Sequence, residues 1–310
     1  MKKLLVVLMA AVMVLSMAAV SMAAVTVSGD ATFTKDFDKD LDKDATNSDK
    51  YDINIFFKNQ INDTVDWTLR FNAAEKWADD AETVNVPWTR EAYANVKLGE
   101  GKLTFGMWEV KPYTSIGILA DNADSAIGRL KAPLTVGYTS PELFPGFKAG
   151  LVYFIDGNKV AKEYDTAHSF EDGAYVLSLS YKAGMVAADL FYVDLALDNQ
   201  EAGYALNAKV NPVDGLTLGL NYGERPGAKN AQTEVMIVEA EYEVNKFYVG
   251  YAMDLEDGKN SLRPDDARTA YRFGYTFANG IGVEYRSKDK DVKAAGKMEP
   301  SQELRIKVKF

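Results

Sequence analysis

Apolar and polar residues alternate one by one along most of this chain. In the last eight residues, Leu304, Ile306, Val308 and Phe310 share one face of an extended strand, and charged residues occupy the other face. Segments with this two-residue period recur along the chain, separated by breaks, and such a period indicates strands rather than helices. With a less regular segment at 87–98 included, the pattern predicts an all-β fold of about 16 strands, an even number.

The breaks between these segments alternate between short and long. Asn279-Gly280 is a typical short break, because this pair favours a two-residue hairpin turn. The long breaks fall at 35–50, 73–86, 111–132, 156–172, 196–202, 224–232, 255–267 and 288–301. Short turns at one end and longer loops at the other are typical of bacterial outer-membrane barrels. Every proline is expected in a break or at the end of a strand, because proline cannot donate to a hydrogen-bonded ladder.

The apolar faces of the segments have aromatic residues at their ends and aliphatic residues between them, as in Tyr175, Leu177, Leu179 and Tyr181. Ordinary strand propensity also favours these aromatic residues, but their position at the ends is the one expected for two aromatic girdles around a lipid band. The sequence therefore predicts one transmembrane antiparallel β-barrel with its polar face towards the lumen. The first segment, 25–34, is expected to pair with the last and close the barrel.

The N-terminus has the three parts of a secretory signal peptide. Two lysines are followed by a long apolar run and then by the small residues that a signal peptidase reads, ending at Ala23. We predict a signal peptide over 1–23 and a single outer-membrane barrel domain over 24–310. An uncleaved membrane anchor is the alternative, because the apolar run is long for a signal peptide.

Charge and composition exclude several classes of function. The formal charge of −10 makes nucleic acid a poor partner, because proteins bind nucleic acid by neutralising its phosphates. The chain has no cysteine, which excludes disulfides, thiolate metal sites and cysteine nucleophiles. After the N-terminal run, no stretch has the ~20 consecutive apolar residues that a membrane helix needs. A membrane role for the rest of the chain therefore requires a closed barrel or attachment at the surface.

Several stretches resemble the general bacterial porins. Residues 25–31, Val-Thr-Val-Ser-Gly-Asp-Ala, are similar to a porin first strand. Residues 90–98 and 103–106 resemble a porin fourth strand, turn and fifth strand, and 136–147 resembles the segment after the third porin loop. With the signal peptide and the terminal Phe310, the order of these stretches extends the resemblance over the whole mature chain.

The resemblance implies a homotrimer in the bacterial outer membrane that allows passive diffusion of small hydrophilic solutes. It also implies that the third long loop, 111–132, folds into the lumen and carries carboxylates opposite a basic wall, which creates a field across a narrow pore. The loop carboxylates of the pore constriction implied in this way are Asp121 and Asp124, with Glu109 at the entry of the loop. The implied basic wall consists of Lys58, Arg70 and Arg90.

The same resemblance implies the partners of the chain. These are outer-membrane lipid, lipopolysaccharide and the barrel-assembly machinery, for which Phe310 is the implied assembly signal. We expect no cofactor, no metal and no enzymatic activity.

Two points in the constriction stay open. Arg90 shares its strand face with Ala92 and Ala94, so either Arg90 faces the lumen and Tyr93 faces outward, or the reverse holds, unless a β-bulge resolves the conflict. The third loop carries few acids, and its apolar run 115–120 could instead pack against the wall as filler.

Further charges are expected on the lumen face of the later strands. They are Glu239, Glu241, Arg272, Arg286 and Arg305. They either pattern the pore for a selective path or form ion pairs between neighbouring strands, each worth roughly 0–1 kcal/mol. The second interpretation is the simpler one. The acidic net charge favours a weak preference for cations.

Two other sequence features are better explained without a functional site. The acidic stretch 35–44 suggests calcium binding, but it lacks the glycine and glutamate spacing of an EF-hand loop. A solvated outer loop is the better interpretation, with bridging of lipopolysaccharide by divalent ions as an alternative. His168, the single histidine, lies in a long break without a strand to hold it, so it does not indicate a catalytic base.

The leading functional hypothesis is therefore a passive outer-membrane diffusion channel. One alternative is a substrate-specific channel with a sugar or anion track, which saturable block of the conductance by one solute would favour. The other is a structural or adhesive barrel with a plugged lumen.

Overall fold

A computed structural model describes ten stretches of the chain. They are residues 25–36, 49–77, 88–111, 116–119, 130–157, 170–198, 200–228, 234–255, 269–292 and 297–310. Residues 1–24 lie outside these stretches, so the signal peptide stays a prediction. No helix in the described residues is long and apolar enough to cross a membrane.

The described residues form eighteen strands, of which sixteen belong to one sheet. These sixteen are β1 (Thr26–Asp36), β2 (Asp49–Gln60), β3 (Val65–Trp77), β4 (Trp88–Leu98), β5 (Gly101–Met107), β6 (Thr135–Thr139), β7 (Phe147–Phe154), β8 (Tyr175–Ala183), β9 (Val186–Asp194), β11 (Gly203–Val213), β12 (Leu216–Glu224), β14 (Glu234–Val244), β15 (Phe247–Asp254), β16 (Thr269–Thr276), β17 (Ile281–Val292) and β18 (Lys297–Lys309). The other two, β10 (Gln200–Glu201) and β13 (Gly227–Ala228), form a separate two-stranded sheet that the alternation did not predict.

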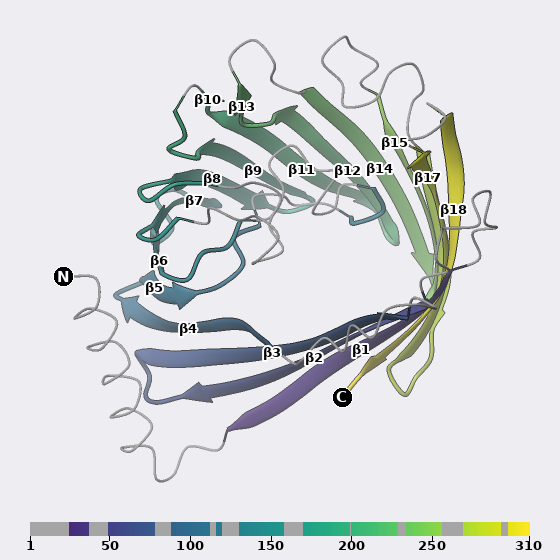
Figure 1. The fold of residues 1–310 in the computed structure, drawn as a ribbon, viewed down its shortest axis with the longest axis horizontal. Helices are drawn as coiled ribbons and strands as arrows, with labels where there is room; N and C mark the ends of the chain where they lie inside the picture. Colours follow the sequence, from purple (N-terminus) through teal and green to yellow (C-terminus); the bar gives the residue numbers. More distant parts are fainter. Residues whose placement is uncertain are drawn as a thin grey trace.

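The large sheet closes into a barrel of antiparallel neighbours (Figure 1). Strand β1 pairs with β2 on one side and with β18 on the other, in the register Asp30 opposite Lys309. One step beyond, the backbone of Gly29 exchanges hydrogen bonds of 2.8 and 3.1 Å with the backbone of Phe310. The predicted count of sixteen barrel strands and the predicted pairing of the first segment with the last are both confirmed.

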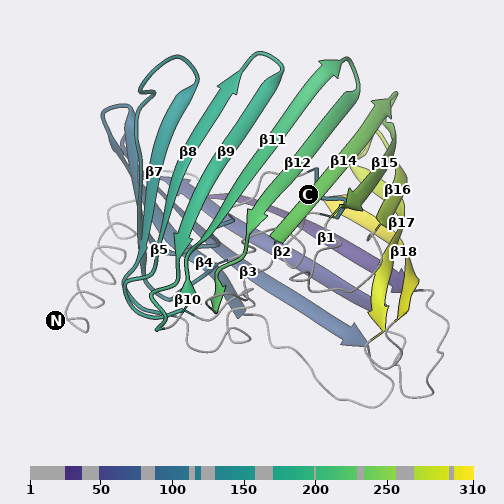
Figure 2. The ribbon, with the colours of Figure 1, turned by 90° about the horizontal axis from the view of Figure 1, so that it is seen from above.

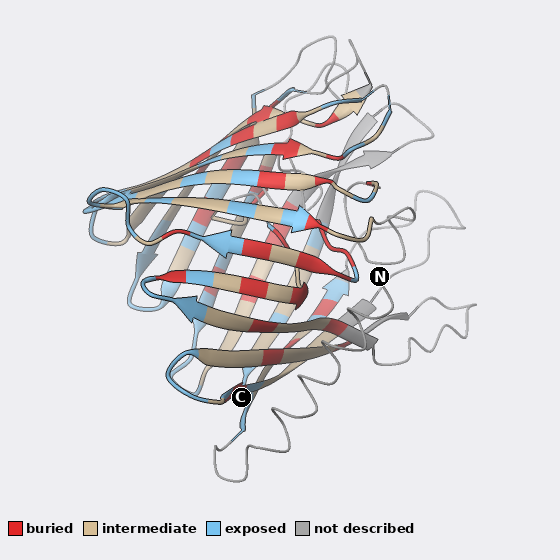
Figure 3. Cartoon of the chain, turned by 90° about the vertical axis from the view of Figure 1, so that its left-hand side faces the viewer, coloured by how far each residue is buried: buried red, intermediate tan, exposed pale blue. Residues whose placement is uncertain are grey.

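The two faces of each strand differ in the way that the alternation predicts. Outward positions keep large apolar side chains exposed, for example Leu177 at 44% and Leu190 at 47%. The burial colours accordingly change along the strands from residue to residue (Figure 3). Aromatic rings pack together on the outer face, with the centroids of Phe273 and Tyr285 5.0 Å apart. These outward side chains form the apolar band that the sequence assigned to lipid.

Short turns join the strands at one end of the barrel (Figure 2). In the turn between β14 and β15, Asn245 and Lys246 both have positive φ, the geometry of the favoured two-residue hairpin. At the other end, two connections are shorter than expected. The break predicted over 73–86 begins too early, because β3 continues to Trp77. The break predicted over 288–301 is wrong in its extent, because β17 continues to Val292 and β18 begins at Lys297.

Two prolines lie inside strands, which corrects the expectation that all lie in breaks or at strand ends. Pro300 pairs with Asp289 in the part of β18 that extends beyond β1, whose pairing ends at Glu303. One side of β18 is therefore an edge there, and an edge tolerates a missing donor. Pro212 lies near the end of β11, where the register with β12 shifts between Val210 and Val213.

One side of the barrel interior is filled by an apolar core. The inner faces of β8, β9, β11, β14, β15 and β16 contribute small and aliphatic residues, and β7 contributes Phe154 at its end. Residues from the connecting segments pack on them. The members are Val110, Ile118, Leu119, Leu130, Ala132, Phe154, Phe170, Ala174, Val176, Val193, Leu195, Ala205, Val235, Ile237, Ala252 and Ala270. All of them are buried, so this part of the interior excludes water.

The seam between β1 and β18 generates a stability prediction. A Cβ added at Gly29 would lie 2.5 Å from the Phe310 ring and 2.6 Å from the Asn54 carbonyl oxygen. Gly29→Ala should therefore destabilise the folded barrel by about 1–3 kcal/mol, the usual effect of overpacking. Urea unfolding of the refolded protein measures this change.

Gly282→Ala is the matched control, because the nearest atom to a Cβ at Gly282 is 3.7 Å away. Its unfolding midpoint should stay close to that of the parent protein. Equal midpoints for the two variants would contradict the packing of Phe310 on Gly29.

Candidate functional site

A bulge at Arg90 brings two neighbouring charges to the inner wall. Arg70 pairs with Glu91 across β3 and β4, but the next pair is Phe71 with Thr89, so Arg90 is an extra residue in the ladder. The open question about Arg90 is resolved by this bulge. Arg90 contacts Glu109, and Glu91 contacts Arg70, so both side chains reach the lumen. Beyond the bulge, Asn95 donates to Asp66 on the inner face of β3.

The acids and bases on the wall of β3 to β5 neutralise each other. Glu109, which follows β5, forms ion pairs with Arg90, with Arg70 at 3.6 Å and with Lys111 at 3.0 Å, and its side chain is 1% exposed. Arg70 is also 3.3 Å from Glu91. Glu109 is therefore in contact with the basic residues and does not face them across the lumen.

Asn54 holds the guanidinium of Arg70 in place. Its Oδ1 accepts hydrogen bonds of 3.0 and 2.8 Å from Arg70, and its Nδ2 donates to Asp30 and Asp52 at 2.9 and 3.0 Å. The Phe56 ring lies under the same guanidinium, 5.2 Å from its carbon, and this is a favourable cation–π distance. In the sequence, Asn54 and Phe56 alternate onto the same strand face as Lys58, but nothing there indicates these roles.

A second group of charges lies on the inner wall of β15 to β18. Glu284 accepts hydrogen bonds of 2.9 Å from both Lys307 and Tyr248, and Arg305 lies 3.9 Å away. Arg305 is also 2.5 Å from Glu303. Tyr248 reaches Glu284 by lying across Gly274, where a side chain would collide with the tyrosine hydroxyl. The ion-pair interpretation therefore fits Arg305.

The segment 116–119 of the third long loop lies against the wall of β12 to β17, inside the ring of strands (Figure 1). Glu239 on β14 accepts hydrogen bonds of 2.8, 2.9 and 2.8 Å from the backbone amides of Ile116, Ile118 and Leu119. Three amides around one carboxylate satisfy the charge of a side chain that is 5% exposed. We call this arrangement the Glu239 latch.

Two arginines bind the carbonyl groups of the same segment. Arg272 donates to Ile116 at 3.0 Å and to Gly117 at 3.3 Å while it forms an ion pair with Glu241 at 2.6 Å. Arg286 donates to the carbonyl of Ile118. The wall therefore provides the loop amides with an acceptor, Glu239, and provides the loop carbonyls with donors, Arg272 and Arg286.

Two glycines on the wall make room for the loop side chains. A Cβ at Gly219 would lie 3.2 Å from Ile116, and one at Gly250 would lie 2.7 Å from Ile118. Ile118 and Leu119 are fully buried, so the described part of the apolar run packs as filler against the wall. Glycines at lumen-facing positions of the strands are the sequence signal that could have located the places where Ile116 and Ile118 pack.

Several predicted residues cannot be placed. Asp121, Asp124 and His168 lie outside the described residues, as does most of the stretch 35–44. In the part of the chain that the structure covers, no group of three or more histidines, cysteines or carboxylates is arranged to hold a metal ion.

A closed barrel of sixteen antiparallel strands with an apolar outer band and charged inner walls defines an outer-membrane channel. The model of the family described as Gram-negative porin matches residues 8–287. The chain therefore belongs to the Gram-negative porin family, and it is an outer-membrane porin.

Solved porin structures are similar to this chain in fold. A fivefold-substituted variant of the porin of Rhodopseudomonas blastica is 15% identical, with a TM-score of 0.65 over 93% of this chain and 100% of that chain. A twofold-substituted variant of the same porin is 13% identical at the same TM-score and coverage. A third structure, described by the words "Asymmetric conductivity of engineered proteins", is 14% identical with a TM-score of 0.65. No curated protein matches the chain.

The latch generates a prediction for hydrogen exchange. Glu239→Ala removes the acceptor of three loop amides, and a hydrogen bond to a charged group contributes about 1.5–3 kcal/mol. The amides of Ile116, Ile118 and Leu119 should therefore exchange about tenfold faster or more in the variant, measured by mass spectrometry on the folded barrel.

Glu243→Ala is the matched control. Glu243 lies on the same face of β14 but is exposed near the short turn. The exchange of residues 116–119 should not change in this variant. Unchanged exchange in Glu239→Ala as well would show that other contacts hold the segment.

Proposed function

We propose that this porin forms a water-filled pore through which small hydrophilic solutes and ions diffuse passively. The observation that carries the proposal is that the two sides of the barrel interior differ in polarity. An apolar core and the Glu239 latch occupy the wall of β8 to β16, whereas the wall of β1 to β5 carries charged and amide side chains, several of them exposed. Polar side chains exposed inside a barrel require water beside them.

The third long loop would fold into the lumen and narrow this pore. The contacts of residues 116–119 with β14, β16 and β17 support this part of the proposal, because the loop starts after β5 on another part of the ring. Asp121 and Asp124 follow the latched segment directly in the sequence. They would face the passage left between the loop and the wall of Lys58, Arg70 and Arg90.

The assembled form would be a homotrimer in the outer membrane, in contact with lipid and lipopolysaccharide. Residues 1–23 would direct export, and the barrel-assembly machinery would recognise the end of β18 at Phe310. The large exposed apolar side chains of the outer face support insertion into lipid.

Conductance tests the pore directly. Purified, folded protein added to a planar lipid bilayer should give large stepwise increases in current that vary linearly with voltage. A barrel plugged by its loops would give none. The absence of channels from protein whose fold has been verified would contradict the proposed function.

The loop carboxylates generate a prediction for ion selectivity. The pore should weakly prefer cations, because acidic groups raise the local concentration of cations. In an Asp121→Asn and Asp124→Asn double variant, the cation-to-anion permeability ratio should fall by a factor of about two to five, the order set by a charge a few ångströms away in water. The reversal potential in a salt gradient measures this ratio.

Glu100→Gln is the control, because Glu100 lies exposed in the short turn between β4 and β5. It should change the ratio less than the double variant does. A larger shift with Glu100→Gln would place the selective carboxylates elsewhere than on the third loop.

A further inference from the structure

The three residues expected in the basic wall differ in how their charges are compensated. Arg70 and Arg90 form ion pairs with Glu91 and Glu109. Lys58 forms no ion pair with any carboxylate that the structure describes, and its side chain is exposed. Its ammonium lies 5.4 Å from the centroid of the Phe56 ring, which favours a cation without neutralising it. Lys58 is therefore the member of the wall whose positive charge remains available to a solute.

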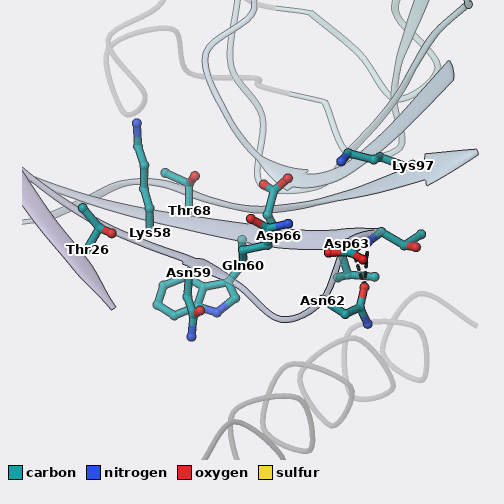
Figure 4. A pocket seen from close by; sticks show the side chains of 12 residues that line it. Thr26, Lys58, Asn59, Gln60, Asn62, Asp63, Asp66, Thr68 and Lys97 are labelled. Carbon is teal, nitrogen blue, oxygen red and sulfur yellow. Dashed lines mark hydrogen bonds between the residues drawn. The ribbon is translucent and has the colours of Figure 1, made fainter. Parts of the chain in front are cut away.

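The neighbours of Lys58 across the sheet are hydroxyl side chains. Thr26 on β1 and Thr68 on β3 lie directly opposite Lys58, and Tyr93 continues the row on β4. Thr68 and Asp66 project from the same side of the sheet as Lys58, and Asn59 projects from the other side (Figure 4). This row of one ammonium and neutral hydroxyls provides hydrogen-bond donors, and Asp66 lies beside it on the same face.

A cavity of about 580 Å³ lies at this place, around the turn that joins β2 to β3. The inner face contributes Thr26, Lys58, Gln60, Asp66, Thr68 and Lys97 to the lining, and the turn and the other face of the strands contribute Asn59, Asn62, Asp63, Thr64, Val65 and Trp67. Lys58, Lys97, Thr26 and Gln60 are exposed and can each donate a hydrogen bond to a group in the cavity.

We propose that this cavity is a weak binding site for small oxyanions, centred on Lys58, and that phosphate or carboxylate groups of solutes occupy it during transit. The proposal rests on the pore function proposed above. Lys58 supplies the central charge, Lys97 adds a second one, Thr26 and Gln60 supply neutral donors, and Phe56 positions Lys58. Charge-assisted hydrogen bonds are the strongest contacts that these side chains can offer an anion.

Two carboxylates in the lining set the strength of the site. Asp66 accepts a hydrogen bond of 2.7 Å from Asn95, which partly satisfies it, and Asp63 lies in the turn at the edge of the cavity. Their charges oppose a bound anion and keep its affinity low. Weak binding suits a transit site, because a solute must leave the pore as readily as it enters.

Single-channel recording in potassium chloride provides the test, with inorganic phosphate and acetate added in separate titrations. In the parent protein, each oxyanion should reduce the chloride conductance saturably. In Lys58→Met, the concentration for half-maximal reduction should rise about tenfold, as expected for the loss of one charge-assisted contact. Lys58→Arg keeps the charge and should restore most of the effect.

Lys209→Met is the matched control. It removes the same charge from the inner face of β11, which lies about halfway around the ring from β2. If the effect of Lys58 were only that of net charge, both methionine variants would weaken the oxyanion effect equally, and the proposed site would be wrong. A loss confined to Lys58→Met supports the site.

The outcomes separate this proposal from the pore function. Channels that conduct chloride but show no saturable response to phosphate or acetate would overturn the oxyanion site and leave the pore function intact. The absence of channels in chloride alone would overturn the pore function itself. A response to phosphate but not to acetate would restrict the site to phosphate groups.

Discussion

The hydrogen-bonded seam between β1 and β18 is the interaction on which the rest of the structure depends. In lipid, an unpaired backbone amide or carbonyl has no water to bind, so a sheet with open edges is not stable there. The seam removes both edges at once, and its last pair is the backbone of Gly29 with that of Phe310. The missing side chain of Gly29 leaves space for the terminal ring. The closed ring then determines which side chains face lipid and which face the lumen.

Inside the ring, the polar groups of two walls are satisfied in different ways. On β14 to β17, a buried carboxylate and two arginines bind the backbone of a loop, and aliphatic side chains beside it exclude water. On β3 and β4, Arg70 and Arg90 are compensated by Glu91 and Glu109. The first wall therefore holds the loop, and the second remains polar and wet. The water-filled passage should therefore lie off the barrel axis, beside the wall of β3 and β4.

The two-residue alternation was sufficient to predict the strand number, the two faces and the closing pair, because lipid outside and water inside impose opposite chemistry on successive residues. It could not predict the interactions that depend on one extra residue or on a distant loop. The bulge at Arg90 could be offered only as one alternative. Glu109 was expected at the entry of the loop, opposite the basic wall, but it lies in contact with Arg90. Glu239 was predicted to face the lumen, but its loop partners are about 120 residues away in the sequence. Pro300 lies in a strand because the hairpin of β17 and β18 extends beyond its neighbour, which no local pattern indicates.

The reactivity of introduced single cysteines measures most directly which side of the lumen is open to water. The chain has no native cysteine, so only the introduced thiol can react. Ser28→Cys and Thr32→Cys place a thiol on the inner face of β1, beside the polar wall. Val176→Cys and Val193→Cys place one in the apolar core, where the native residues are 2% and 0% exposed. We predict that a charged thiol reagent modifies the first pair in the folded barrel and modifies the second pair only after unfolding. Equal modification of all four in the folded barrel would contradict it.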